Sequence, residues 1–161
     1  MNPHLDTPYV YLEMLPDGIL LARYKPGIYI DLPAAKEIVA SRLAFTEGNT
    51  VPVLLYIDGV ATIDRKVRNY ISSPEGVKAL SAAAIIKDSP FAAMVANLFV
   101  SLNNPLKMPV RIFTKEGKAI LWLRTFLPKD KQSPLSTTQP VTPFPSPFPG
   151  EQHQRTPGDT K

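Results

Sequence analysis

The stretch Val51-Pro52-Val53-Leu54-Leu55-Tyr56-Ile57 decides the fold of this chain. It is a nearly continuous apolar run. Such a run is typical of a strand that is covered on both of its faces. Strands of this kind belong to sheets with helices on either side. We therefore expect an α/β protein with residues 51–57 as a central strand.

A β-hairpin and a helix are expected ahead of this strand. Residues 9–15 place their apolar side chains on alternate positions, as in a half-buried strand, and residues 19–24 form a second strand. Pro16-Asp17-Gly18 supplies a turn between them, since proline presets φ and glycine accepts a positive φ. Asp31-Leu32-Pro33 then predicts a helix start, and Glu47-Gly48 predicts its end.

Two short elements and a loop are expected behind the central strand. Residues 58–64 are predicted as a loop that continues into a polar stretch ending at Tyr70. Ser73-Pro74-Glu75 has the pattern of another helix start. Residues 80–86 are rich in alanine and predict a strand against which a helix can pack closely.

The clearest amphipathic helix is predicted over residues 91–102, after the cap pattern Ser89-Pro90. Its apolar residues recur at i, i+3, i+4, i+7, i+8 and i+11, which is one face of an α-helix. Residues 110–113 are predicted as a last short strand. Thr114 is expected to cap a final helix whose apolar face comprises Ala119, Trp122, Leu123 and Phe126.

These elements predict an α/β fold with a mixed β-sheet, in which an opening hairpin is followed by alternating β-α units packed with about four helices. The later strands are expected to be parallel. Eight of the 18 prolines lie in residues 128–161, where large apolar residues are few. Such a segment cannot bury enough surface to offset the entropy of ordering it. We therefore expect a domain over residues 1–127 and a disordered tail over residues 128–161.

Composition excludes several classes of function. The chain has no cysteine, which excludes disulfides, thiolate metal sites and a cysteine nucleophile. The net charge of +4 comes from scattered cations that alternate with acids, so nucleic-acid binding is not expected. No signal-peptide pattern is found, and no apolar run approaches the roughly 20 residues that span a bilayer. A cytoplasmic protein is the expectation.

Few residues are suited to catalysis. His4 and His153 both fall outside the expected elements, which disfavours common hydrolytic chemistry and zinc sites. Asp58 and Asp64 could together hold a magnesium ion. We favour another interpretation, in which Asp58 makes an Asx turn with Gly59 and Asp64 caps a helix, because no phosphate-binding loop or third ligand accompanies them. No enzymatic activity and no cofactor are expected.

Three further features leave alternatives open. Arg65, Lys66 and Arg68 form a basic cluster that could contact an acidic partner or simply face solvent. The apolar stripe over residues 91–102 could line a ligand pocket, although such stripes are more often core. The proline-rich segment 142–149 could dock as a polyproline II helix or be an inert end.

The sequence between Val53 and Asp64, together with residues 109–114, resembles a known family. It is similar to SpoIIAA-like and STAS domains, in which an apolar strand leads to an Asp, a short loop and a second Asp at a helix start. The order of elements agrees over residues 9–127. The resemblance implies a SpoIIAA-like sheet and contact with a protein partner through the loop after the third strand.

One departure from that family concerns regulation. In anti-sigma-factor antagonists the phosphorylated serine follows the second Asp directly, whereas this chain has Arg65 and Lys66 there. A fixed positive charge cannot be a phosphorylation switch. Thr62, Ser72 and Ser73 carry hydroxyls nearby but stand at other positions.

The resemblance and the residues together lead to one expected function. We expect a non-catalytic STAS-like regulatory module that binds a protein partner. The alternative is a module for a small ligand or lipid, with an apolar pocket under the helix at residues 91–102. The expected partner-binding residues are Asp58, Gly59, Thr62, Asp64, Arg65, Lys66 and Arg68.

Overall fold

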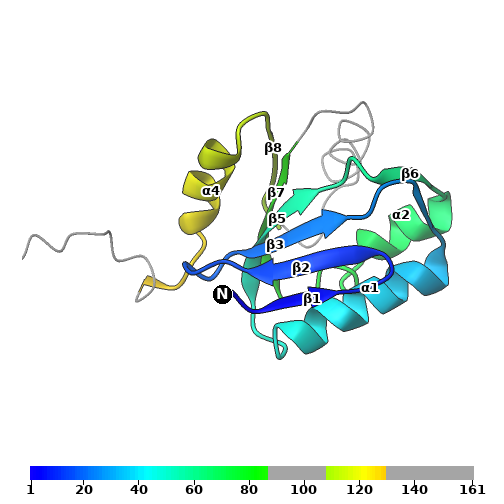
Figure 1. The fold of residues 1–161 in the computed structure, drawn as a ribbon, viewed down its shortest axis with the longest axis horizontal. Coiled ribbons are helices and arrows are strands. Elements are labelled where there is room, and N and C mark those ends of the chain that lie inside the picture. The colour runs from blue at the N-terminus through cyan, green and yellow to red at the C-terminus, as the bar shows by residue number, and fades with distance from the viewer. Residues whose placement is uncertain (87–107, 130–161) are drawn as a thin grey trace, which may run out of the picture.

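A six-stranded mixed sheet forms the centre of the computed structural model, which describes residues 1–86 and 108–129 (Figure 1). The strand order is β1-β2-β3-β5-β7-β8. The first three strands pair antiparallel and the later pairs are parallel. These strands are β1 (His4–Asp6), β2 (Val10–Met14), β3 (Leu20–Tyr24), β5 (Val51–Tyr56), β7 (Leu80–Ile86) and β8 (Val110–Phe113).

The apolar run at residues 51–57 contains β5, which lies between β3 and β7 and is parallel to both. Val53 and Leu54 are almost fully buried. Because successive side chains of a strand point to opposite faces, these two residues enter different cores. Val53 packs in the core beneath α1 (Leu32–Phe45), and Leu54 packs beneath α4 (Glu116–Arg124). The prediction of a central strand covered on both faces is confirmed.

The opening hairpin is confirmed as β2 and β3, which the turn at Gly18 joins with a φ of 90°. Sequence analysis missed β1, which extends the sheet beyond β2. His4 lies in β1, so the expectation that neither histidine occupies an element was wrong for this residue. A strand of three residues is too short to show the alternation on which the prediction depended.

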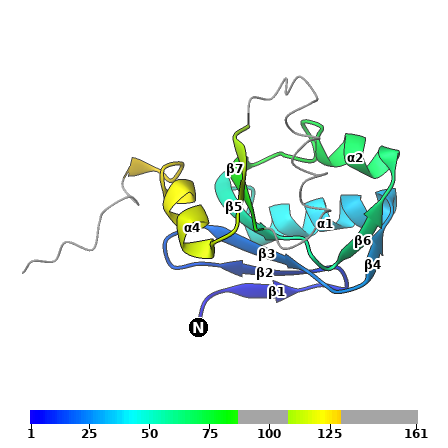
Figure 2. The same cartoon turned by 90° about the horizontal axis from the view of Figure 1, so that it is seen from above.

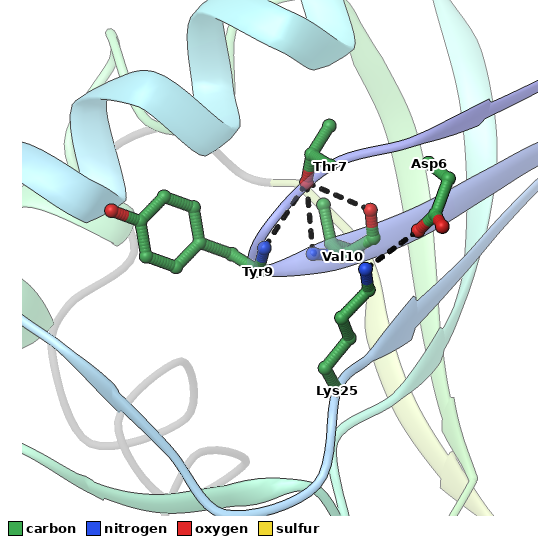
Figure 3. Close-up of polar contacts among 5 residues, drawn as sticks. All are labelled: Asp6, Thr7, Tyr9, Val10 and Lys25. Atoms are coloured by element: carbon green, nitrogen blue, oxygen red, sulfur yellow. Dashed lines mark hydrogen bonds and ion pairs between the residues drawn. The ribbon is translucent and has the colours of Figure 1, made fainter.

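The Thr7 hydroxyl forms three hydrogen bonds in the turn between β1 and β2 (Figure 3), where the Thr7 N–H also donates to the Val10 carbonyl at 3.1 Å. The Thr7 Oγ1 donates to the Val10 carbonyl at 2.8 Å and accepts from the backbone N–H groups of Tyr9 and Val10 at 3.3 and 3.0 Å. Lys25 follows β3, and its Nζ forms an ion pair with Asp6 at 2.8 Å. The backbone N–H of Lys25 also donates to the Tyr9 carbonyl at 2.9 Å. The end of β3 is therefore fixed against the first hairpin.

The predicted first helix is confirmed as α1. Asp31 is its N-cap and accepts from the backbone N–H of Ala34 at 2.9 Å. The helix ends at Phe45 with Thr46 as its C-cap, and Glu47 and Gly48 both have positive φ values, of 51° and 70°. Glycine adopts such a conformation without steric cost, which explains the chain reversal at Gly48.

The last helix, α4, covers the face of the sheet opposite to α1 and α2 (Arg65–Ile71) (Figure 2). Ala82 and Ala84 of β7 share a core with Ala119 and Leu123 of α4, as the small residues of this strand predicted. The prediction that Thr114 caps this helix was wrong. Lys115 occupies the N-cap position with an extended backbone and no side-chain cap bond, so the helix begins one residue later than a Thr114 cap requires.

Two predictions between β5 and β7 were also wrong. Residues 58–64 are not a simple loop, because they contain β6 (Val60–Ile63), which pairs in parallel with β4 (Ile28–Ile30) in a second sheet. No helix begins at Ser73. Its Oγ instead accepts from the Gly76 N–H at 3.2 Å, and this turn brings Gly76 back against the end of α2.

Three helices lie in the described part of the chain, against about four expected for the whole domain. The helix predicted over residues 91–102 lies outside the described residues, as does the tail from residue 130. Within residues 1–86 and 108–129, no helix combines the length and apolar character needed to cross a membrane.

Candidate functional site

A tight backbone turn follows β5 and contains the first two expected site residues. The Val60 N–H donates to the Ile57 carbonyl at 3.0 Å, with Asp58 and Gly59 between them. Ile57 is buried while the Asp58 side chain is exposed. A backbone turn therefore contains this pair, and Asp58 follows the carboxyl end of the central strand. Within residues 1–86 and 108–129, the Asp58 side chain does not form the hydrogen bond to the backbone that an Asx turn requires.

Gly59 has a structural role in this turn. A Cβ placed at Gly59 would lie 2.2 Å from the carbonyl oxygen of Lys25. The Gly59 carbonyl accepts from the Ile28 N–H at 3.2 Å, which joins the turn to the start of β4. The backbone of the turn thus lies directly on the chain that leaves β3, and only glycine fits there.

Asp58 and Asp64 lie at opposite ends of β6. A strand of four residues spans roughly 13 Å. Two ligands of one magnesium ion each bind it at about 2 Å, so the two carboxylates do not form one magnesium site. Asp64 instead accepts from the Val67 N–H at 2.8 Å and is the N-cap of α2. The helix-cap interpretation of Asp64 is confirmed.

The first turn of α2 presents two cations. Arg65 and Lys66 are exposed, whereas Val67 is almost fully buried and anchors the helix to the sheet. Among residues 1–86 and 108–129, neither Arg65 nor Lys66 forms an ion pair. Arg68 differs from both, because it is half-buried and its Nε has no hydrogen-bond partner in the described part of the chain.

Tyr29 of β4 is a site residue that sequence analysis missed. Its side chain is 57% exposed, and its partner in the register of the parallel pair is the exposed Thr62 of β6. Paired residues of parallel strands present their side chains on the same side of the sheet. We call Tyr29, Thr62, Arg65 and Lys66 the β6–α2 surface. Asp58 and Gly59 lie at the other end of β6 and are not part of it.

A cavity of about 130 Å³ lies between the sheet and helices α1 and α2. Its described lining includes Ile38, Val53 and Ala83, and Arg42 and Tyr24 are the polar side chains that residues 1–86 and 108–129 bring to it. The alternative expectation placed a pocket under the segment 91–102, which lies outside the described residues. The described lining of this cavity comes mainly from the two sheets and from α1 and α2, and it includes Met108.

A separate polar cluster joins β3 and β5 to α4. The Arg23 guanidinium lies 4.6 Å from the centroid of the Tyr56 ring, and the Tyr56 hydroxyl donates to Glu116. Desolvation is the main cause that raises the pKa of Tyr56 to about 12, and the hydrogen bond to Glu116 adds to it. Folding therefore favours the protonated phenol.

This shift predicts a loss of stability in strong base. The unfolded phenol ionises near pH 10, so the contribution of Tyr56 is fully present below pH 10 and is lost as pH rises through about 12. We expect the free energy of unfolding, measured by urea titration, to fall over this range. Tyr56→Phe should make that fall shallower, and an identical slope in both proteins would contradict the assignment. Burial also raises the pKa of Tyr24, so some slope remains in the variant.

A family model matches most of the chain. A family described as a domain of unknown function (DUF7793) matches residues 13–127. This range includes the whole of the β6–α2 surface. The description of the family does not refer to STAS domains. No curated protein matches the chain.

Proposed function

Because the chain belongs to the DUF7793 family, whose function is unknown, we propose a function from the geometry of the described residues. We propose that it is a non-catalytic, STAS-like regulatory module that binds an acidic protein partner through the β6–α2 surface. Asp58 and Gly59 support this surface from the turn before β6, and Arg68 supports it from within α2.

The observation that carries the proposal is the pair of exposed cations at Arg65 and Lys66. The N-terminal end of a helix bears a partial positive charge, so cations in the first turn do not stabilise it. Asp64 offsets part of this cost as the N-cap. No carboxylate pairs with either cation within residues 1–86 and 108–129. An acidic surface would supply the missing counter-charges.

Tyr29 gives this surface an anchor in addition to its charge. Tyrosine and arginine are enriched among the residues that dominate binding energy at protein interfaces. The Tyr29 ring is more than half exposed and stands beside Thr62, on the sheet that leads directly into α2. The aromatic group lies on β4 opposite Thr62 of β6, and the two cations lie in the first turn of α2, which follows β6.

The STAS-like assignment is supported by the mixed sheet and by the position of the surface after its central strand. In the domains that this chain resembles, a serine after the second Asp switches partner binding by phosphorylation. Arg65 and Lys66 keep a constant charge instead. We therefore propose a permanent electrostatic contact, whose strength depends on salt rather than on a kinase.

The test reverses both charges with Arg65→Glu and Lys66→Glu. Like charges placed against an acidic partner cost several kcal/mol, so capture of the partner in a quantitative pull-down should fall at least tenfold. Capture by the unmodified protein should also weaken between low and high salt. Circular dichroism and the thermal midpoint should stay unchanged, because exposed charges contribute little to stability.

Lys115→Glu with Lys118→Glu is the matched control. Both lysines are exposed on or beside α4, away from the β6–α2 surface, and the change in net charge is the same. The control should capture the same partners as the unmodified protein. Equal capture by all three proteins would show that the β6–α2 surface is not the binding site. Unfolding of the Arg65 and Lys66 variant would show that these residues are structural.

A further inference from the structure

The cavity between the sheet and helices α1 and α2 has the size of a small ligand. Its volume is about 130 Å³. Engineered apolar cavities of about 150 Å³ stay dry and bind benzene. Side chains from β5, β7 and α1 form its walls, among them Val53, Ala83 and Ile38. An apolar body of about one ring would therefore fit.

Among the described residues that line this apolar cavity, Arg42 is the one with a charged side chain. Arg42 belongs to α1 and is only 7% exposed. Its Nη1 donates to the Lys78 carbonyl at 2.7 Å, and its Nη2 donates to the Gly76 carbonyl at 3.0 Å. A guanidinium carries five N–H donors. These two bonds do not use all of them, so Arg42 has further N–H groups with which it can bind a ligand.

The charge of Arg42 has no counter-ion within residues 1–86 and 108–129. Burial of an unpaired charge is costly, and desolvation lowers the pKa of Arg42 accordingly. The nearby phenols of Tyr24 and Tyr70 act in the opposite direction. Tyr24 also lines the cavity, so a cation and a phenol occupy one corner of an otherwise apolar space.

We propose that this cavity binds a small apolar carboxylate of about the size of benzoate, with its ring among the apolar walls and its carboxylate paired with Arg42. Guanidinium and carboxylate groups match in geometry and form charge-assisted hydrogen bonds. The ligand would supply the counter-ion that Arg42 lacks. This site shares no residue with the β6–α2 surface, although Val60, Ile63 and Val67 of β6 and α2 also line it, and the proposal does not depend on the partner proposed above.

A purely structural role for Arg42 makes a different prediction. If the guanidinium only ties α1 to the backbone at residues 76–78, a neutral ligand of the same shape should bind as well as an acid. Benzoate and benzamide provide this comparison, since they share the ring and differ in charge. We expect benzoate to bind the full chain at least tenfold more tightly than benzamide at pH 7, measured by calorimetric or NMR titration.

Two variants test whether the preference for benzoate comes from Arg42 and whether binding occurs in the cavity. Arg42→Gln keeps an N–H donor for a carbonyl but removes the charge, so the affinity ratio of benzoate to benzamide should fall to about one. This ratio is insensitive to a loss of folded protein, because both ligands meet the same folded fraction. Ala35→Leu fills the cavity from α1 and should abolish binding of both ligands. Arg124→Gln, on α4, is the control and should leave the ratio unchanged.

A further measurement needs no variant. Bound benzoate should show intermolecular NOEs from its ring protons to the methyl groups of Ile38 and Val39, which line the cavity. The proposal is overturned if neither ligand binds the unmodified protein, if both bind equally, or if the NOEs place benzoate elsewhere. Partner capture by the β6–α2 surface is tested with other residues, so the two proposals can fail independently.

Discussion

Leu54→Ala is expected to lower the free energy of unfolding by about 2–5 kcal/mol, the usual cost of removing a buried leucine side chain. Leu54 has no exposed surface and lies in β5, the strand that packs between β3 and β7. Its side chain belongs to the core between the sheet and α4. The neighbouring residues Ala82 and Ala84 are too small to move into the space, so most of the cavity should remain.

Urea denaturation of the unmodified and variant proteins measures this change. Leu121→Ala is the control, because Leu121 is 63% exposed on α4 and the substitution keeps a helix-forming residue. The control should change stability by no more than about 0.5 kcal/mol. A loss below about 1 kcal/mol for Leu54→Ala would mean that the core refills the site, or that α4 does not cover β5 as described.

The elements that could be predicted from sequence are those with enough residues to show a period or a cap. The strands β2, β3, β5, β7 and β8 and the helix α1 all fall where their patterns placed them. The strands β1, β4 and β6 have three or four residues and show too little alternation to be recognised; β8 also has four residues and is the exception, recognised just ahead of the pattern of the last helix. A bulge in the pairing of β4 with β6 further obscures it, since Ala61 and Thr62 are both exposed.

The candidate site was predicted only in part, for a similar reason. Asp64 was recognised as a helix cap because its role depends on local sequence. Tyr29 was missed because its exposure follows from the pairing of β4 with β6, which are distant in sequence. The position of Arg42 depends on carbonyls 34 and 36 residues further along the chain. No helical period indicates such a contact, so a buried arginine reads as an ordinary surface position of α1.

The carbonyl of Lys25 lies against Gly59, and for this reason we expect the turn after β5 to tolerate no side chain at that position. Lys25 cannot easily move away, because its N–H donates to the Tyr9 carbonyl at 2.9 Å. Its Nζ also pairs with Asp6 at 2.8 Å (Figure 3). The methyl group of an alanine at position 59 would lie 2.2 Å from the carbonyl oxygen of Lys25. Either the turn or the end of β3 must shift, and the hydrogen bond from Ile28 to the Gly59 carbonyl weakens with it.

Gly59→Ala should therefore destabilise the fold by about 1–3 kcal/mol or more, as forced overpacking does. Gly117→Ala is the matched control, because a Cβ at Gly117 in α4 meets nothing within 4 Å. There the added methyl group should stabilise the helix by about 0.5–1 kcal/mol, since alanine loses less backbone entropy than glycine. Urea titration of both variants measures these two changes in the free energy of unfolding. If Gly59→Ala retains full stability but loses its partner, Gly59 contacts the partner directly; if it loses stability, as we expect, the glycine holds the turn from which β6 and the β6–α2 surface begin.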